Sequence, residues 1–228
     1  MDEVNNLTKV LEFLYLGDLD NSLDRFLLED EGITHVLSVL DGSKKKYSKF
    51  KYYIIDIKDY PWVNISKYFS KAVHFIHKAR MANTGCLVHC GMGISRSVTI
   101  ILAYLVTTTR LPWQQCLQAI QGIRPEAGPN SGFIRQLTEY QDSLAQKPEL
   151  WEQYADHPLR YDDIRAIKQM YNIKNNGVPY EVYAKANVFT RIPGGSSRGA
   201  GFRDQVRDMT REMRSNGIGN DSDDSDEQ

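Results

Sequence analysis

The chain has 228 residues, a length that suits one domain with an extension or two very small domains. Hydrophobic residues make up 41% of it and charged residues 25%, proportions that are ordinary for a soluble globular protein. The formal net charge of −1 excludes a bulk electrostatic attraction to nucleic acids or acidic membranes, so no nucleic-acid partner is expected.

The cysteines and the apolar runs indicate the compartment and exclude some classes of site and membrane span. Three cysteines, an odd number, and no signal peptide favour a reducing compartment, the cytoplasm with the nucleus as the alternative. No Cys and His spacing typical of zinc sites is present, and neither a metal nor a cofactor is expected. The longest apolar run, near residues 98–106, is too short to span a bilayer.

Apolar patterning in the first half of the chain predicts alternating strands and helices. Four runs predict strands, at residues 13–16, 33–40, 51–57 and 86–88. Between them, helical spacing covers residues 22–29 and a stripe that begins at Ile65 and ends at Ala79. Strands separated by helices predict an α/β fold with a central, mostly parallel twisted sheet and helices on both faces.

A lysine-rich segment follows the second predicted strand. The turn at residues 41–43 leads into Lys44, Lys45, Lys46 and Lys49. We interpret this segment as a solvated loop, with a docking site for acidic partners as the alternative.

The second half of the chain predicts further helices and then a change of character. A buried helix at residues 97–106 precedes a helix that ends near Ile123, a rigid connector at 124–129 and a last helix that begins after Asn130. The domain therefore covers residues 9–146. Composition divides the rest into a flexible N-terminus at 1–8, an extension with short helices at 147–191 and a disordered acidic tail at 192–228.

The stretch from Cys86 to Ser97 has the order of an anion site. It reads as a buried strand, a glycine-bearing turn and the start of a buried helix, where inward backbone N–H groups and the helix N-terminus attract negative charge. Cys90 opens the turn and Arg96 closes it, with five residues between them. A thiol facing these donors has a pKa below the ordinary value of about 8.5. A thiolate held against an arginine-bound phosphate is a nucleophile for phosphoryl transfer.

These residues carry a resemblance to a known family. The segment at residues 89–97, His-Cys-Gly-Met-Gly-Ile-Ser-Arg-Ser, resembles the signature of cysteine-based protein phosphatases. It is most similar to the small atypical dual-specificity branch, of the JNK-pathway-associated or myristoylated-testis type. The resemblance extends from about Lys9 to about Gln146 and includes the segments 13–17, 33–39 and 129–133. It implies a protein-tyrosine-phosphatase-like fold.

The resemblance also implies the reaction and its partners. The expected activity is hydrolysis of phosphotyrosine and of phosphoserine or phosphothreonine on proteins through a phosphocysteine. Stress-kinase pathway members are implied as partners by resemblance only. Relatives often begin Met-Gly for myristoylation, whereas this chain begins Met1-Asp2-Glu3, so no membrane anchor is expected. Neutral Met92 and Ile94 favour a singly phosphorylated side chain over a phosphoinositide.

The loop residues have distinct expected roles. Cys90 is the nucleophile, and Arg96 binds the phosphate and stabilises its transition-state charge. Ser97 donates its hydroxyl to the cysteine sulfur, with simple helix capping as the alternative, and His89 orients the loop. The expected backbone donors to the phosphate are Gly91, Met92, Gly93, Ile94 and Ser95.

A carboxylic acid must protonate the leaving oxygen. Asp59 is the favoured candidate because it lies in a loop after a strand, at a spacing similar to that of the family's acid loop. Asp56 is the rival, but it falls within the strand pattern, where a structural pairing is expected. In the family, the residue at Asn130 braces the phosphate loop, although a helix cap explains it equally well.

The sequence leaves two questions with an alternative answer, namely the role of Cys86 and the function of the protein. Cys86, four residues before the nucleophile, is expected to be a core residue, with a protective disulfide to Cys90 as the alternative. The contrasting functional hypothesis is a catalytically weak phosphopeptide-binding scaffold. Such proteins typically lack the cysteine or the acid, both of which are present here.

Overall fold

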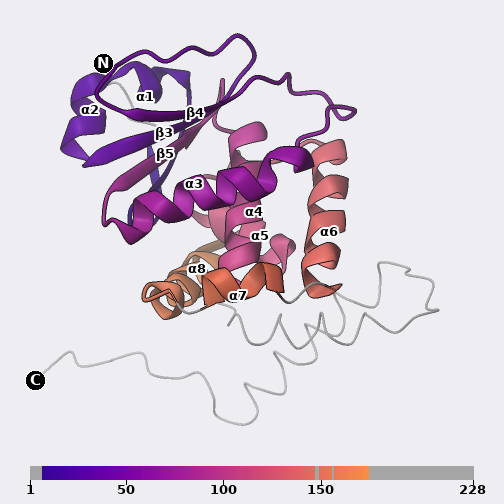
Figure 1. The fold of residues 1–228 in the computed structure, drawn as a ribbon. Coiled ribbons are helices and arrows are strands. Elements are labelled where there is room, and N and C mark those ends of the chain that lie inside the picture. The colour runs from indigo at the N-terminus through magenta and orange to yellow at the C-terminus, as the bar shows by residue number, and fades with distance from the viewer. Residues whose placement is uncertain (1–6, 147–148, 156, 175–228) are drawn as a thin grey trace, which may run out of the picture. The chain divides into compact units, whose positions relative to one another are not determined.

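The computed structural model describes residues 7–146, 149–155 and 157–174. Within them lies a five-stranded sheet in the order β1-β2-β5-β3-β4 (Figure 1). Its strands are β1 Thr8–Leu11, β2 Leu14–Gly17, β3 Ile33–Val39, β4 Lys51–Ile55 and β5 Gly85–His89. β1 pairs antiparallel with β2, and the other pairs are parallel. The predicted α/β fold with a mostly parallel sheet is confirmed.

Helices cover both faces of this sheet. The α-helices are α1 Leu19–Leu23, α2 Arg25–Asp30, α3 Phe69–Met81, α4 Arg96–Thr109, α5 Trp113–Ile123, α6 Ser131–Gln146, α7 Glu149–Ala155 and α8 Arg160–Lys174, and a 3-10 turn, η1, covers Ser66–Tyr68. In Figure 1, α1 and α2 lie on one side of the strands and α3 and α4 on the other.

The core follows the alternation of side chains along each strand. On the α2 face, Leu28 packs in a cluster with Tyr15 of β2, Val36 of β3 and Leu87 of β5. On the opposite face, α4 is buried at every position after its first residue, as the apolar run at 97–106 predicts. A helix buried all round needs neighbours on every side, and α3, α5 and α6 pack against it.

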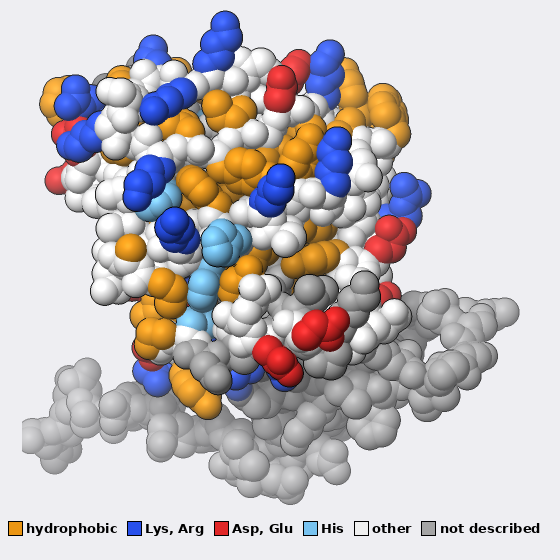
Figure 2. Space-filling view, viewed as in Figure 1, with side chains coloured by type: hydrophobic (Ala, Val, Ile, Leu, Met, Phe, Trp, Pro, Cys, Tyr) orange, Lys and Arg blue, Asp and Glu red, His pale blue; other side chains and the backbone are white. Residues whose placement is uncertain are grey.

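The parallel strands bring their carboxyl ends to one edge of the sheet. At this edge, β5 runs into the turn before α4, β3 into the lysine-rich loop and β4 into the loop that carries Asp59. In open α/β sheets this edge is where ligands bind. Figure 2 shows that Lys and Arg side chains are more frequent than Asp and Glu over the upper part of the visible face, on the side where α4 begins.

Two details of the N-terminal region differ from the prediction. Thr8 begins β1, an edge strand too short to show a pattern, so the predicted flexible stretch at 1–8 overlaps the sheet. The single helix predicted at 22–29 is two helices, because Asp24 has extended backbone and its carboxylate accepts the Leu27 N–H at 3.0 Å. A side chain that caps a new helix interrupts the one before it.

The predicted extension contains α7 and α8, which pack onto the domain. α8 packs against α5, and a buried ion pair joins Arg80 of α3 to Asp163 of α8, with N–O distances of 2.8 and 2.7 Å. Arg80 also donates to the Tyr104 hydroxyl at 2.9 Å and to the Glu12 carbonyl at 2.8 Å. The packed part of the chain thus continues beyond the predicted boundary at residue 146.

The acidic tail predicted at 192–228 lies outside the described residues, as does the extension from 175 onward. Among the described helices, none combines the length and apolar character needed to cross a membrane.

Candidate active site

The loop at residues 90–95 joins β5 to α4 at the carboxyl edge of the sheet. Cys90 is its first residue and is 2% exposed, whereas Met92 at its outer bend is 70% exposed. The Cys90 sulfur accepts the Gly93 N–H at 3.2 Å and the Ser97 hydroxyl at 3.2 Å. Arg96 is the first residue of α4, so Ser97 lies inside the helix and is not its cap. The structure therefore brings Cys90, Arg96 and Ser97 together.

Four successive carbonyls of this loop are held from outside. The Gly91 oxygen accepts the Leu19 N–H at 3.2 Å, and the Ile94 oxygen accepts the Gly128 N–H at 2.9 Å. The Met92 and Gly93 oxygens both accept from the Arg124 guanidinium, at 3.0 Å each. Since carbonyls and N–H groups of a tight loop point to opposite sides, these bonds leave the N–H groups to face inward, as an anion site requires.

Gly93 is the loop position where only glycine fits. Its φ of 69° lies in the left-handed region. A Cβ placed there would also lie 2.6 Å from Arg124 Nη2 and 2.7 Å from the Gly17 carbonyl oxygen. Any side chain at this position would therefore displace the arginine that holds the loop.

The loop lowers the pKa of the Cys90 thiol. Burial alone raises this pKa, but hydrogen bonds from the Ser97 hydroxyl and backbone, together with the charge of Arg96 and a loop N–H, outweigh it. The other two cysteines behave in the opposite way, since burial raises the pKa of both Cys86 and Cys116, the latter to about 12. Of the three thiols, Cys90 alone is prepared as a nucleophile.

Arg96 has a partly free guanidinium. Its Nη1 donates to the Ile57 carbonyl at 3.2 Å, which fixes the side chain over the loop. Its Nε is buried without a hydrogen-bond partner among the described residues, although it lies 3.5 Å from Asp59 Oδ2, within ion-pair range. An unsatisfied buried donor beside a ring of backbone N–H groups is suited to a phosphate oxygen.

Asp59 is fixed beside the loop by two side chains. Its Oδ1 accepts the Ser95 hydroxyl at 2.9 Å and the Asn130 amide at 2.7 Å. Its carboxylate remains 30% exposed. The rival Asp56 follows β4 and accepts the Gly42 N–H at 2.9 Å, which is a structural pairing. The structure thus brings Asp59 to the loop, and not Asp56.

Asn130 contacts the helix, the acid and the phosphate loop through different groups. Its side-chain oxygen caps α6 by accepting the Phe133 N–H at 3.0 Å, and its amide group donates to Asp59. Only its backbone N–H reaches the loop, where it donates to the Ser95 hydroxyl at 3.1 Å.

α6 holds the acid loop as a unit. Gln136 accepts the Ile65 N–H at 2.8 Å and donates to the Val63 carbonyl at 2.8 Å. Gly132 packs directly against the backbone of Pro61, so a Cβ would overlap it. These contacts leave the exposed rings of Tyr60 and Trp62 stacked, with centroids 4.8 Å apart, just after Asp59.

His89 directly precedes the nucleophile and contacts its backbone carbonyl. Burial lowers its pKa to about 4, so the ring is neutral at physiological pH. Its Nδ1 lies 3.3 Å from the Cys90 carbonyl and its Nε2 lies 2.6 Å from the Ser38 hydroxyl. Because a carbonyl only accepts, the hydrogen-bond pattern assigns the proton to Nδ1. The ring orients the loop, and does not act as an acid.

Sequence analysis missed the role of the connector at 124–129. Arg124 is 4% exposed and holds two loop carbonyls, and Gly128 holds a third. These bonds join residues about thirty positions apart, which no local pattern reveals. The signal in the sequence that could have indicated this role is an arginine that directly precedes a proline, in a connector predicted to be rigid.

In the described structure Cys86 and Cys90 are too far apart to form a disulfide without movement of the backbone. Cys86 is the second residue of β5 and Cys90 follows the last, so at about 3.3 Å per residue their Cα atoms lie about 13 Å apart. A disulfide requires about 7 Å or less. Cys86 is a fully buried core residue.

The fold and this loop define the class of cysteine-based phosphatases. Comparison with known proteins identifies the family within that class. A family model for the dual specificity phosphatase catalytic domain matches residues 14–143, more than half of the chain. The chain therefore belongs to the dual-specificity protein phosphatases, as its signature motif predicts.

Individual relatives agree with this assignment. The chain is 41% identical over 166 residues to dual specificity protein phosphatase 22-B of Danio rerio, which covers 72% of this chain and 91% of the relative. It is 42% identical over 166 residues to dual specificity protein phosphatase 15 of Mus musculus, covering 72% and 71%. The crystal structure of DUSP15 superposes with a TM-score of 0.62 at 39% identity, covering 67% of this chain and 99% of that one.

Proposed function

We propose that this chain hydrolyses phosphotyrosine and phosphoserine or phosphothreonine on proteins by a two-step mechanism centred on Cys90. In the first step the thiolate attacks phosphorus, the bond to the substrate oxygen breaks, and phosphocysteine forms. Arg96 and the inward N–H groups of the loop stabilise the charge on the equatorial oxygens. The observation that carries this proposal is the set of four outward-held carbonyls around a thiol of lowered pKa.

Asp59 supplies the proton in the first step and removes one in the second. Its Oδ1 is occupied by Ser95 and Asn130, which leaves Oδ2 to carry the proton to the leaving oxygen. The resulting carboxylate then takes a proton from the water that attacks phosphocysteine. Ser97 stabilises the departing thiolate through its hydroxyl, which lies 3.2 Å from the sulfur.

The substrates are phosphorylated proteins, and we propose stress-kinase pathway members as the first to test. That choice rests on the family resemblance alone. We also propose that the protein acts in the cytoplasm, with the nucleus as the alternative, because an activated thiol requires a reducing compartment.

The test is hydrolysis of p-nitrophenyl phosphate with reductant and a chelator present. We expect Cys90→Ser to abolish turnover and Asp59→Asn to lower kcat about 100- to 1,000-fold. Asp56→Asn is the matched control, since it changes a neighbouring carboxylate that accepts the Gly42 N–H instead of bonding to the loop, and it should retain most of the activity.

Two outcomes would contradict the proposal. Equal losses in the two aspartate variants would remove Asp59 from its assigned role. A folded wild-type protein that binds phosphopeptides without hydrolysing them would favour the scaffold alternative.

A further inference from the structure

A second pocket adjoins the catalytic loop on the α1 side of the sheet. It has a volume of about 250 Å³ and is formed by α1, the end of β3, the lysine-rich loop, Tyr52 of β4 and His89 of β5. This volume is below the range of roughly 300–1,000 Å³ that is typical of sites for whole small molecules. It suits a single side chain.

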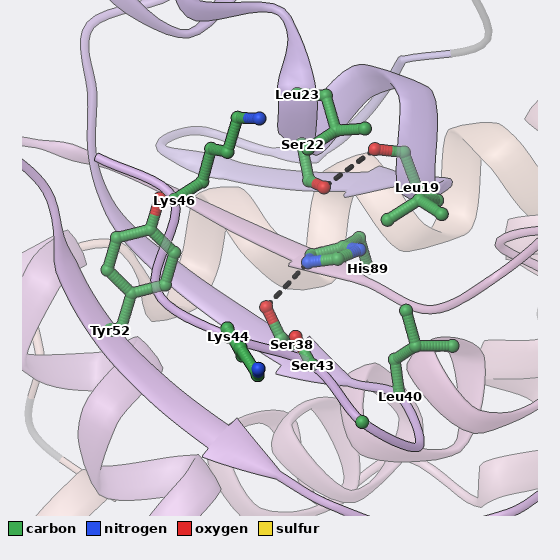
Figure 3. Close-up of a pocket in the computed structure, with 11 residues that line it drawn as sticks. Leu19, Ser22, Leu23, Ser38, Leu40, Ser43, Lys44, Lys46, Tyr52 and His89 are labelled. Atoms are coloured by element: carbon green, nitrogen blue, oxygen red, sulfur yellow. Dashed lines mark hydrogen bonds between the residues drawn. The ribbon is translucent and has the colours of Figure 1, made fainter.

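Both apolar and cationic side chains line this pocket. Figure 3 shows Leu19 and Leu40 on one side, with Lys44, Lys46 and Tyr52 across from them. The Ser38 hydroxyl and the His89 ring lie between the two sides and are hydrogen-bonded to each other at 2.6 Å. A ligand that fits both sides has methylene groups near its attachment point and a negative charge at its end.

The two lysines of the pocket carry charge that the described residues do not neutralise. Within the described part of the chain, no carboxylate lies within ion-pair distance of Lys44 or Lys46. By contrast, Lys49 of the same loop pairs with Glu29 at 3.0 Å. The nearby Asp41 and Asp56 are also engaged, with Lys58 at 3.9 Å and with a backbone N–H, respectively.

The pocket shares its wall with the catalytic loop. The backbone N–H of Leu19 donates to the Gly91 carbonyl, and the Leu40 side chain lies against Gly91. His89 directly precedes Cys90. The pocket and the catalytic loop are therefore adjacent, and the two sites can engage neighbouring residues of one substrate chain.

We propose that this pocket binds an anionic side chain of the phosphoprotein substrate, a few residues from the one that is dephosphorylated. The anion is a carboxylate or a second phosphate, which share the chemistry that lysine ammonium groups recognise. This inference rests on the proposed phosphatase activity and adds a determinant of substrate choice. The lysine-rich loop is then a recognition element and not merely a solvated one.

The test uses phosphotyrosine peptides that carry alanine at every neighbouring position or glutamate at one of them, from four residues before to four after. The readout is the ratio of kcat/KM for each glutamate peptide to that for the alanine peptide. We expect one position to favour glutamate about tenfold in the wild-type protein. Replacing that glutamate with phosphothreonine then assigns the preferred anion to a phosphate or to a carboxylate.

The matched pair of variants separates the pocket from general electrostatics. Lys44→Gln/Lys46→Gln removes the two pocket lysines, and we expect its ratio to fall to about one. Lys45→Gln/Lys49→Gln removes the same charge from the same loop outside the pocket, and we expect it to keep the wild-type ratio. Equal ratios in the two variants, or a wild-type protein without a preferred position, would overturn the proposal.

Hydrolysis of p-nitrophenyl phosphate by each protein serves as a separate reference. This substrate has no side chain to place in the pocket. If the wild-type protein fails on it, the phosphatase mechanism is contradicted. If the wild-type protein hydrolyses it but shows no anion preference among the peptides, only the pocket is contradicted.

Discussion

Two buried arginines hold opposite edges of the same sheet, and they do so in different ways. Arg80 is fully buried near the edge where β5 begins and is neutralised by the equally buried Asp163. Arg124 is 4% exposed at the edge where β5 ends, and its described bonds include two to backbone carbonyls of the catalytic loop. Among the described residues it also pairs with Glu126 at 3.4 Å, and the Glu126 side chain is 46% exposed.

The difference teaches what each arginine contributes. The bidentate ion pair of Arg80 with Asp163 joins two elements, α3 and α8, and both of its side chains are buried. A guanidinium bonded to carbonyls instead fixes the direction of a backbone, and so determines where the opposite N–H groups point. The first arrangement contributes to stability and the second to catalysis, which makes the two regions separable by mutation.

The largest expected effect is on stability, at Arg80. Arg80→Ala leaves Asp163 as a buried carboxylate without its partner, which costs about 3–5 kcal/mol of unfolding free energy. Urea denaturation measures the loss, and Arg165→Ala, which removes an exposed arginine of α8, is the control. The remaining folded protein should hydrolyse p-nitrophenyl phosphate at nearly the wild-type rate. A loss of activity without a loss of stability would break the comparison.

Arg124 should show the reverse pattern. Arg124→Lys replaces a planar fork by a single ammonium that cannot hold both loop carbonyls, so we expect kcat/KM to fall about 10- to 100-fold. We expect the pH dependence of Cys90 alkylation by iodoacetate to shift upward, because the loop donors lose their direction. The exposed Arg135→Lys is the control. An unchanged alkylation profile would show that Arg124 is only a structural residue.

The smallest expected effect is the pH dependence of stability that His77 of α3 contributes. Burial, followed by the neighbouring His157 and Arg80, lowers the pKa of His77 to about 4. The native state therefore binds fewer protons than the unfolded state below about pH 6.5, so stability is fully present above that pH and is lost as pH falls towards 4. Because the ring is only half-buried, we expect about 1 kcal/mol between pH 7.5 and 5.

Urea denaturation at the two pH values measures this effect. His77→Gln should reduce the loss between the two pH values by about 1 kcal/mol, whereas His74→Gln, an exposed position on the same helix, should leave it unchanged. The loss that remains comes from groups such as His89 and His157, whose pKa values burial also lowers. The same loss in all three proteins would assign the pH dependence to other groups.

The sequence predicts the order of strand, turn and helix around the catalytic loop well because these elements are adjacent in the sequence. A buried strand, a glycine-bearing turn and an apolar helix fall within about twenty residues, and they place Cys90, Arg96 and Ser97 as the structure shows. Asp59 is predictable from its place after a strand. The family assignment made from the motif is also confirmed.

The parts that escape prediction depend on contacts between distant residues. Arg124 bonds to residues 31 and 32 positions away, and Arg80 bonds to a residue 83 positions away. Charged residues are rarely buried, so a sequence pattern places both arginines at the surface. The break between α1 and α2 was missed for another reason. Asp24 reads as an ordinary polar position, and only its cap geometry reveals its role.

The most direct test of the central claim is to identify the phosphorylated residue during turnover. Ser97→Ala should slow breakdown of phosphocysteine, because the departing thiolate loses its hydroxyl donor, and so allow the intermediate to accumulate. Acid quenching, proteolysis and mass spectrometry then locate the added phosphoryl group. The account predicts it on Cys90 and on no other residue. Turnover with the phosphoryl group on another residue, or with no phosphoenzyme while the breakdown step limits the rate, would contradict it.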